Sequence, residues 1–344
     1  MDHQPPEIRV LVTGGSGYVG SVLVPYLART YPVRVLETMA FGNPIADTPN
    51  VEFIKGDIRD AGIVKIALQD ITHVVHLAGI VTDELCDMNP SLARAINEEA
   101  TQQLCQLAKE AGIQRLIYAS SSSVYGTQDE ECTEETVPKP MTVYAETKLQ
   151  AEKICLTYAG EKMCVAVLRS ATCMGPAPRM RLDTIVNTFS KQAFYDRQIT
   201  VWDGKQYRSN IHIQDVAFLY ANLLAANAEK VNGQWFNGVF SSRRALTIAK
   251  IVKTEADWWW TDKIPIVVDE TKEDKRHYRM ASILTRSILG WNPLMGRSIA
   301  EAVSDNFTWF AQGKISDPDS DLYVNTKRMA SFMKVPQGPV KGEK

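Results

Sequence analysis

Short, largely apolar runs rich in β-branched residues alternate with amphipathic stretches along the first half of the chain. Continuous apolar runs are typical of strands buried on both faces, whereas apolar residues three and four apart are typical of a helix. The runs that predict strands are Ile8–Val12, Val33–Leu36, Val51–Ile54, Val74–Ala78, Leu116–Ala119 and Cys164–Leu168. Their alternation with helices predicts an α/β fold with a doubly wound parallel sheet.

Prolines break this alternation at Gly175-Pro176-Ala177-Pro178, and the texture of the sequence changes there. We therefore predict two domains. The first comprises residues 1–175, and the chain returns to it at about 206–240. The second is a smaller mixed α/β substrate domain of residues 176–205 and 241–315. Residues 316–344 are predicted to be a polar C-terminal tail.

The composition is that of an ordinary globular protein, with 344 residues of which 45% are hydrophobic and 23% charged. A net charge of −2 gives no bulk attraction to nucleic acid or to an anionic membrane, and no apolar run approaches the ~20 residues of a membrane span. Six cysteines without a Cys-x-x-Cys pair and five histidines form no zinc-like cluster. Because the N-terminus also lacks a secretory signal pattern, we expect a cytoplasmic protein that binds no metal, nucleic acid or membrane.

The first predicted strand leads into a loop with glycines at three-residue intervals, Gly14, Gly17 and Gly20, and then into a helix. Backbone N–H groups of such a loop approach a phosphate closely, and the helix N-terminus favours its charge. A glycine loop alone is a weak signal, because a tight turn also needs glycine. Glu37 ends the second strand, where an acid binds the ribose of adenosine and repels a 2′-phosphate. Together these features favour NAD over NADP, with an ordinary loop carboxylate as the alternative for Glu37.

Four serines, Ser120–Ser123, follow the fifth predicted strand, and Tyr144 and Lys148 stand on the next predicted helix. Their spacing of four places phenol and ammonium on one helix face. A phenol has a pKa near 10, so an ammonium that favours the phenolate and a serine that shares its proton would let it deprotonate a hydroxyl group. Two further pairs with this spacing follow no serine-rich strand end and are predicted to be ordinary solvated residues: Tyr158/Lys162 and Tyr323/Lys327.

Two conspicuous features have structural interpretations. His76 lies inside an apolar run, so we predict a hydrogen-bonded core histidine rather than a catalytic one. The triplet Trp258-Trp259-Trp260 could stack on a nucleobase, but we expect buried tryptophans on a late helix.

Six motifs of this chain occur together in one enzyme family. They are Thr13-Gly14-x-x-Gly17-x-x-Gly20, Gly56-Asp57-Ile58, His76-Leu77-Ala78-Gly79, Ser120-Ser121-x-x-Val124-Tyr125-Gly126, Tyr144-x-x-x-Lys148 and Ile211-His212-Ile213-x-Asp215-Val216-Ala217. Over residues 8–310 the chain resembles the extended short-chain dehydrogenase/reductase family, in its NAD-dependent epimerase/dehydratase branch acting on nucleotide sugars. The resemblance implies a Rossmann-type fold, NAD as cofactor, a nucleotide-diphosphate sugar as substrate, and a homodimer packed through helices near 91–111 and 144–159.

The resemblance also implies roles for particular residues, with Ser121, Tyr144 and Lys148 as the catalytic set. The implied cofactor-binding residues are Gly14, Gly17, Tyr18, Val19, Gly20, Glu37, Asp57, Ile58, Leu77, Ala78, Gly79, Asn97, Tyr144 and Lys148. The implied substrate-binding residues are Ser121, Ser122, Thr172, Arg179, Arg181, Arg208 and Arg276. Arg208 matches a position that commonly holds the substrate's diphosphate, and Arg276 is the expected second clamp, because a guanidinium suits phosphate geometry.

Departures from the family pattern narrow the expected reaction. The family's 4,6-dehydratases carry an Asp-Glu pair after the catalytic hydroxyl, where this chain has Ser122 and Ser123. The glutamate that decarboxylases commonly carry before Val-Tyr-Gly is missing, and Thr172 replaces a common asparagine, which leaves the sugar open. We expect epimerisation at C4 through a transient keto intermediate. A 4-ketoreductase or dehydrogenase with the same triad is the alternative, and a non-catalytic NAD-binding scaffold is a distant one.

Overall fold

A seven-stranded sheet forms the centre of the fold, with strand order β11-β7-β5-β4-β1-β2-β3. The computed structural model describes residues 7–271 and 277–333. The strands of this sheet are β1 (Val10–Thr13), β2 (Val33–Glu37), β3 (Val51–Lys55), β4 (His73–His76), β5 (Arg115–Ser121), β7 (Cys164–Ser170) and β11 (Gln234–Gly238). All neighbouring pairs are parallel, which confirms the predicted Rossmann-type sheet.

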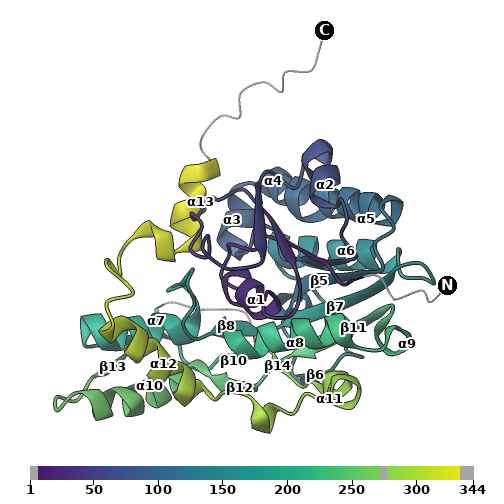
Figure 1. The fold of residues 1–344 in the computed structure, drawn as a ribbon. Helices are drawn as coiled ribbons and strands as arrows, with labels where there is room; N and C mark the ends of the chain where they lie inside the picture. The colour runs from purple at the N-terminus through teal and green to yellow at the C-terminus, as the bar shows by residue number, and fades with distance from the viewer. Residues whose placement is uncertain (1–6, 272–276, 334–344) are drawn as a thin grey trace.

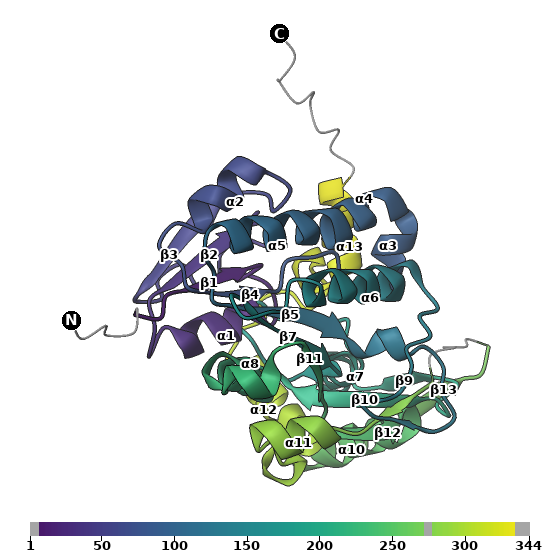
Figure 2. The same ribbon diagram turned by 90° about the vertical axis from the view of Figure 1, so that its right-hand side faces the viewer.

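Helices cover both faces of the sheet, as Figure 1 and Figure 2 show. One face carries α2 (Ala61–Ala67), α5 (Ala100–Glu110) and α6 (Val143–Leu156), and the other carries α1 (Gly20–Leu27) and α8 (Ile213–Ala225). Successive side chains of a strand point to opposite faces. Val10 and Val12 therefore pack with Leu23 of α1, whereas Leu11 packs in a second core with Leu104 of α5. Both faces are buried, which explains why the predicted runs are apolar at nearly every position.

A smaller region is built mainly from two segments of the chain. One lies between β7 and β11, and the other follows β11, which itself belongs to the large sheet. Its strands pair as β8 (Thr172–Met174), β10 (Tyr207–His212) and β12 (Ser241–Arg244), as β9 (Ile199–Trp202) with β13 (Ile266–Asp269), and as β6 (Glu131–Cys132) with β14 (Arg279–Met280). Its main helices are α7 (Ile185–Lys191), α10 (Ala245–Trp259) and α12 (Ile299–Ala311). Val186, Ile248 and Phe307 belong to the separate apolar core that these helices enclose.

The remaining helices are short and connect or cover these layers. They are α3 (Asp83–Met88), α4 (Pro90–Arg94), α9 (Ala228–Val231), α11 (Ile283–Leu289) and α13 (Asn325–Met333), with single turns at Ala95–Glu99, Ser122–Tyr125, Gln192–Asp196, Pro293–Met295 and Asp321–Tyr323. The helix α13 lies in the segment predicted as a polar tail, and Met329 packs against the apolar cluster that contains Ile80 and Leu85. This part of the segment is therefore a folded element and not a simple tail.

The tryptophan triplet does not behave as predicted. Trp258 is 85% exposed and Trp259 41% exposed, so the expectation of buried tryptophans is wrong for both. The triplet stands at the C-terminal end of α10, with Trp260 as the residue that caps the helix. Trp260 is partly buried and packs against the core, with its ring centroid 5.4 Å from that of Phe307, while the Trp259 centroid lies 5.9 Å from the same ring.

A buried ion pair fixes the helix α6 to the large sheet. Arg169 on β7 donates from Nε to Glu152 of α6 over 3.0 Å, and each side chain is only 3% exposed. Arg169 also donates to the Tyr125 hydroxyl at 3.0 Å, which in turn donates to Asn237 at 2.8 Å. Removing one charge from a buried pair costs about 3–5 kcal/mol because the other is left uncompensated. The network therefore holds the helix that carries Tyr144 and Lys148.

Among residues 7–271 and 277–333, no helix has the length and apolar character needed to cross a bilayer. The same residues contain no group of three or more metal-ligating side chains. The cysteines are free thiols, as expected, including Cys105 and Cys155, whose sulfur atoms lie 3.6 Å apart.

Candidate active site

A cavity of about 1450 Å³ runs along the carboxyl ends of the parallel strands. Doubly wound sheets bind their ligands at this edge. The volume exceeds the roughly 300–1,000 Å³ of common small-molecule pockets. It therefore has room for a dinucleotide and a second ligand. The residues that follow β1, β2, β3, β4, β5 and β7 all contribute to its lining, together with residues of the smaller region.

The glycine loop lines one end of this cavity and fits a pyrophosphate group. Gly14 has a φ of +73°, and a Cβ there would lie 2.7 Å from the Ala78 nitrogen. A Cβ on Gly20 would lie 2.5 Å from the Gly15 oxygen. Only glycine fits both positions, so the backbone stays open for close approach by an anion at the N-terminus of α1. Gly17, Tyr18 and Val19 also line the cavity.

Glu37 lies at the end of β2 and lines the cavity beside this loop, where the sequence analysis expects the ribose-binding acid. Its Oε2 accepts a hydrogen bond from the Ser16 N–H at 3.2 Å, and its Oε1 accepts one from the Thr38 N–H at 2.9 Å. The predicted adenine-flanking residues Asp57 and Ile58 also line the cavity. The loop and its acid thus form one connected unit.

The end of β4 supplies Leu77, Ala78 and Gly79 to the lining, as the sequence analysis expects. Asn97, the other cofactor residue implied there, does not line the cavity. Its amide is buried and bonded to the backbone of Ile80 and to the Thr147 hydroxyl. Asn97 therefore holds the loop after β4 against α6 and stands behind the cavity wall.

His76 is a core histidine, as predicted. Its ring nitrogens lie 2.7 Å from the Thr13 hydroxyl and 2.9 Å from the Thr101 hydroxyl. Burial lowers the pKa of His76 to about 3, so the ring is neutral at physiological pH.

The structure brings Ser121, Tyr144 and Lys148 together in the cavity. Ser121 ends β5, and Thr142 caps the N-terminus of α6 by accepting a hydrogen bond from the Ala145 N–H, which fixes the start of the helix that carries the other two. Ser121 lies close enough to the Tyr144 phenol to lower its pKa. The three residue types needed for a hydroxyl-deprotonating site therefore line one cavity.

Burial raises the pKa of Tyr144 above its ordinary value, while the hydrogen bond with Ser121 lowers it, the charge of Asp83 raises it and that of Arg181 lowers it. The net direction is upward, so the expected lowering of this pKa is wrong for the protein alone. Burial also lowers the pKa of Lys148 to about 8. Its Nζ lies 4.4 Å from the centre of the Tyr118 ring.

The two serines after Ser121 each have a hydroxyl partner. Ser123 Oγ donates to Ser121 Oγ at 3.0 Å. Ser122 Oγ lies 2.8 Å from the hydroxyl of Tyr278, which comes from the smaller region and lines the same cavity. The positions where dehydratases carry an acid pair are therefore occupied by hydroxyls.

The other Tyr-x-x-x-Lys pairs lie outside the cavity. Tyr158 packs against the core between β-sheet and α5, with Lys109 over its ring at 5.9 Å. Tyr323 packs against the apolar core of the smaller region. Both tyrosines are thus more packed than the solvated residues that the sequence analysis expects.

Of the predicted substrate-binding residues, Thr172, Arg179, Arg181 and Arg208 also line the cavity, whereas Arg276 lies outside the described residues. Arg181 donates from Nε to Asp183 at 2.8 Å, and although burial opposes it, this partner raises the pKa of Arg181. Burial and the nearby Arg181 lower the pKa of Arg179 to about 9. Arg208 is buried on β10 and donates to the Tyr207 carbonyl at 2.7 Å.

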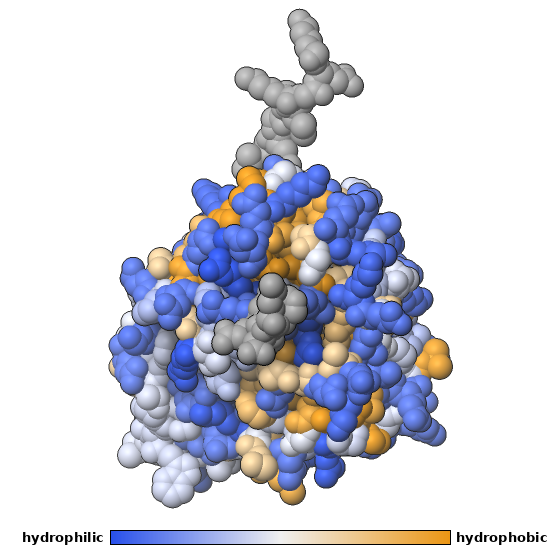
Figure 3. Space-filling model, turned by 45° about the vertical axis from the view of Figure 1, so that its right-hand side comes forward, coloured by the Kyte–Doolittle hydropathy of each residue, from blue (hydrophilic) through white to orange (hydrophobic). Residues whose placement is uncertain are grey.

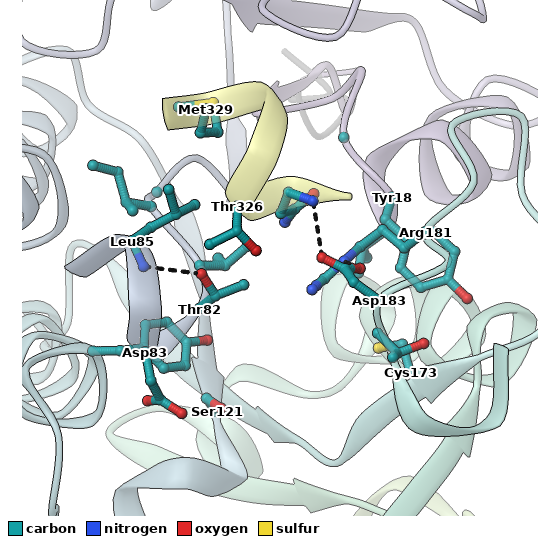
Figure 4. Close-up of a pocket in the computed structure, with 18 of the residues that line it drawn as sticks. Tyr18, Thr82, Asp83, Leu85, Ser121, Cys173, Arg181, Asp183, Thr326 and Met329 are labelled. Carbon is teal, nitrogen blue, oxygen red and sulfur yellow. Dashed lines mark hydrogen bonds and ion pairs between the residues drawn. The ribbon is translucent and has the colours of Figure 1, made fainter. Parts of the chain in front are cut away.

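Several cavity residues escaped the sequence analysis. Asp83 opens α3 and accepts a hydrogen bond from Thr142 at 2.6 Å, and Figure 4 shows its carboxylate close to Ser121. Tyr278 and Asp183 also line the cavity, as do four residues of the C-terminal segment, Val324, Asn325, Thr326 and Met329. None carries a local motif. An isolated polar residue outside the strand ends can only be placed here by tertiary structure.

The fold and site together define an NAD-binding enzyme of the doubly wound class with a Ser/Tyr/Lys set. The chain belongs to the NAD dependent epimerase/dehydratase family, whose family model matches residues 10–237. The cofactor is therefore NAD, in agreement with the glycine loop and Glu37.

Proteins similar to this chain have two different activities. The dTDP-D-glucose 4,6-dehydratase of Mus musculus is 28% identical over 305 residues, or 83% of this chain and 84% of the relative. The UDP-glucose 4-epimerase of Mycolicibacterium smegmatis is 27% identical over 320 residues, or 88% of this chain and 98% of the relative. The structure of MoeE5 in complex with UDP-glucuronic acid and NAD is 25% identical with a TM-score of 0.76, covering 89% of this chain and 99% of that one. Overall similarity thus does not separate epimerisation from dehydration.

Proposed function

We propose that the protein is an NAD-dependent epimerase that inverts C4 of a nucleotide-diphosphate sugar, with Tyr144 as base. The observation that carries the proposal is the run of serines beside Tyr144, where no carboxylate follows Ser121 in the sequence. Ser121 lies beside the Tyr144 phenol and lowers its pKa, and Ser122 and Ser123 stand where a dehydratase needs an acid and a base. Serine hydroxyls do not titrate near neutral pH, so they do not drive elimination of water.

In the proposed mechanism, the Tyr144 phenolate accepts the proton of the C4 hydroxyl, which gives a transient keto group. Ser121 orients that hydroxyl, and protonated Lys148 stabilises the phenolate by its charge. Bound NAD supplies the hydride acceptor and donor, and the positive charge of its oxidised ring favours the phenolate. When the hydride returns to the other face of the sugar carbon, Tyr144 gives its proton back to the oxygen. Protons and electrons balance, so NAD is regenerated.

The diphosphate of the substrate is proposed to bind at Arg208, which comes from the smaller region and reaches the cavity wall. Arg181 is proposed to contact the sugar or phosphate, because Asp183 holds its guanidinium in place through Nε. A planar guanidinium with several donors suits phosphate oxygens. The similarity to a dTDP-D-glucose 4,6-dehydratase and a UDP-glucose 4-epimerase supports a nucleotide sugar as substrate class.

The decisive experiment starts with the purified protein and mass spectrometry of its bound small molecules, where we expect NAD. The protein is then incubated with UDP-, GDP-, CDP- and dTDP-sugars without added cofactor. We expect a product of unchanged mass and no lasting rise in absorbance at about 340 nm, the band of the reduced nicotinamide. Net accumulation of NADH would favour the dehydrogenase alternative. A product lighter by one water would indicate a dehydratase, and absence of turnover in protein that holds NAD would indicate a non-catalytic scaffold.

A homodimer and a cytoplasmic location stay predictions. The proposed dimer packs through the helices near 91–111 and 144–159, which in the structure are α4, α5 and α6. Light scattering at micromolar concentration measures the mass directly, and a monomer mass would contradict the dimer.

A further inference from the structure

The described part of the C-terminal segment, residues 316–333, lies across the active-site cavity. Figure 4 shows Thr326 and Met329 of α13 above the opening, with Thr82, Asp83 and Leu85 on one side and Arg181 on the other. Figure 3 shows hydrophobic side chains at the surface where the C-terminal residues leave the described chain. Four residues of this segment line the cavity. One wall of the site is therefore supplied from the end of the chain.

The segment is fastened at the end of the cavity where Glu37 lies. Arg328 Nε donates to the Ala40 carbonyl at 2.9 Å, in the loop that follows β2. Asn325 accepts a hydrogen bond from Arg179, whose guanidinium lies 3.8 Å from the ring centre of Phe41 in the same loop. The loop after Glu37 thus contacts α13 in two ways, directly through Arg328 and indirectly through Arg179.

The segment is also fastened at the end of the cavity where the triad lies. Met329 packs against the apolar cluster of Ile80 and Leu85, against which Tyr144 also packs. On the opposite side of the opening, beside Arg181, the Asn325 N–H at the start of α13 donates to Asp183 at 2.9 Å. The negative charge of this carboxylate stabilises the N-terminal end of α13 through the helix dipole. The segment therefore joins the loop after β2, the loop after β4 and the smaller region.

We propose that residues 316–333 are a strap that closes over bound NAD and slows its release. A dinucleotide that reaches from Glu37 to Tyr144 lies between the two fastening points, so it can leave only after α13 detaches from one of them. The purpose of the strap rests on the proposed function, because an epimerase that loses NADH before the hydride returns cannot finish its turnover. The strap itself requires only that NAD is bound.

The test measures NAD release from the full-length protein loaded with NAD. Excess isotopically labelled NAD is added, and mass spectrometry follows the exchange with time. The variants Arg328→Ala and Met329→Ala each loosen one fastening point, and the double variant loosens both. The matched control is Lys327→Ala on the same helix, whose 58% exposed side chain pairs at 3.8 Å with Asp321, also 58% exposed and in the same segment. We expect exchange about tenfold faster in the double variant and unchanged in the control, a tenfold change being about 1.4 kcal/mol.

Exchange at the wild-type rate in a folded double variant overturns the strap. If the double variant loses its circular dichroism spectrum, the single variants decide, and each should exchange about threefold faster for the loss of one contact. The assay contains no sugar, so absence of epimerisation would sink the proposed function and leave the strap intact. Conversely, an active epimerase whose variants exchange NAD normally has no strap.

Discussion

Replacing Glu37 tests the cofactor site most directly, because this carboxylate has two tasks in the structure. It faces the cavity as the proposed ribose acceptor, and through Oε2 it accepts the Ser16 N–H of the glycine loop at 3.2 Å. Glu37→Ala removes both contacts, whereas Glu37→Gln keeps one acceptor oxygen and the side-chain shape but removes the charge. Glu52→Ala on the neighbouring strand is the control, since its carboxylate is 58% exposed and pairs with Arg34 on the surface.

The size of the effect follows from these contacts. The hydrogen bonds of Glu37 with the adjacent Thr38 do not hold the ligand or the glycine loop. The loss of NAD affinity therefore comes from the missing bonds to the ribose and to Ser16 of the glycine loop. Hydrogen bonds to a charged acceptor contribute about 1.5–3 kcal/mol and neutral ones about 0.5–1.5 kcal/mol. We therefore expect NAD affinity to fall by about 1–3 kcal/mol in the alanine variant, or about 5- to 150-fold, and by about half that free energy in the glutamine variant. NADP affinity should rise in both, because the repelling charge is gone.

Calorimetric titration of cofactor-stripped protein with NAD and NADP measures both quantities, and thermal unfolding checks that the fold is kept. Unchanged NAD affinity in Glu37→Ala, with the NAD preference intact, would refute the assignment of Glu37 to the ribose. An equal loss in Glu52→Ala would show instead that the effect spreads through the sheet and does not report a contact with the ligand.

Three further predictions concern the reaction itself. Tyr144→Phe should lower turnover by about 10²-fold or more with NAD still bound, while Tyr158→Phe, outside the cavity, keeps the wild-type rate in the same assay; equal rates would require another base. Asp83→Asn removes a charge that raises the pKa of Tyr144, so the rise of the pH–rate profile should move to lower pH, and a shift upward would contradict this electrostatic coupling. Arg208→Ala should weaken nucleotide-sugar binding by about 1.5–3 kcal/mol, with the lysine variant recovering only part; unchanged Michaelis constants would place the diphosphate elsewhere.

The large sheet and its cofactor loop were predictable because their signals are local. Strands buried on both faces need apolar residues at every position, and the structure shows Val10 and Leu11 packing in opposite cores. The glycines of the loop are likewise required by close contacts within a few residues or with the neighbouring strand. Tyr144 could be distinguished from the other tyrosines with the same spacing because Ser120–Ser123 precede it at a strand end.

The features that the sequence analysis missed depend on distant partners. Arg328 contacts Ala40, 288 residues earlier in the chain, and nothing in the polar sequence around it indicates that contact. The direction of the pKa of Tyr144 depends on burial by several segments, which outweighs the charges expected to lower it. Trp258 shows the reverse error, since the apolar character of a side chain alone does not reveal whether other elements cover it.

The position of β11 has a consequence for biosynthesis. This strand pairs with the outer edge of β7, but the ribosome makes it only after β8, α7, β9, β10 and α8. Until then β7 presents an unpaired edge whose residues Val165 and Val167 are fully buried in the finished protein. Such an edge is a template for pairing with another chain. A nascent chain stalled before Gln234 is therefore prone to aggregation and is a natural client for chaperones that shield exposed strands.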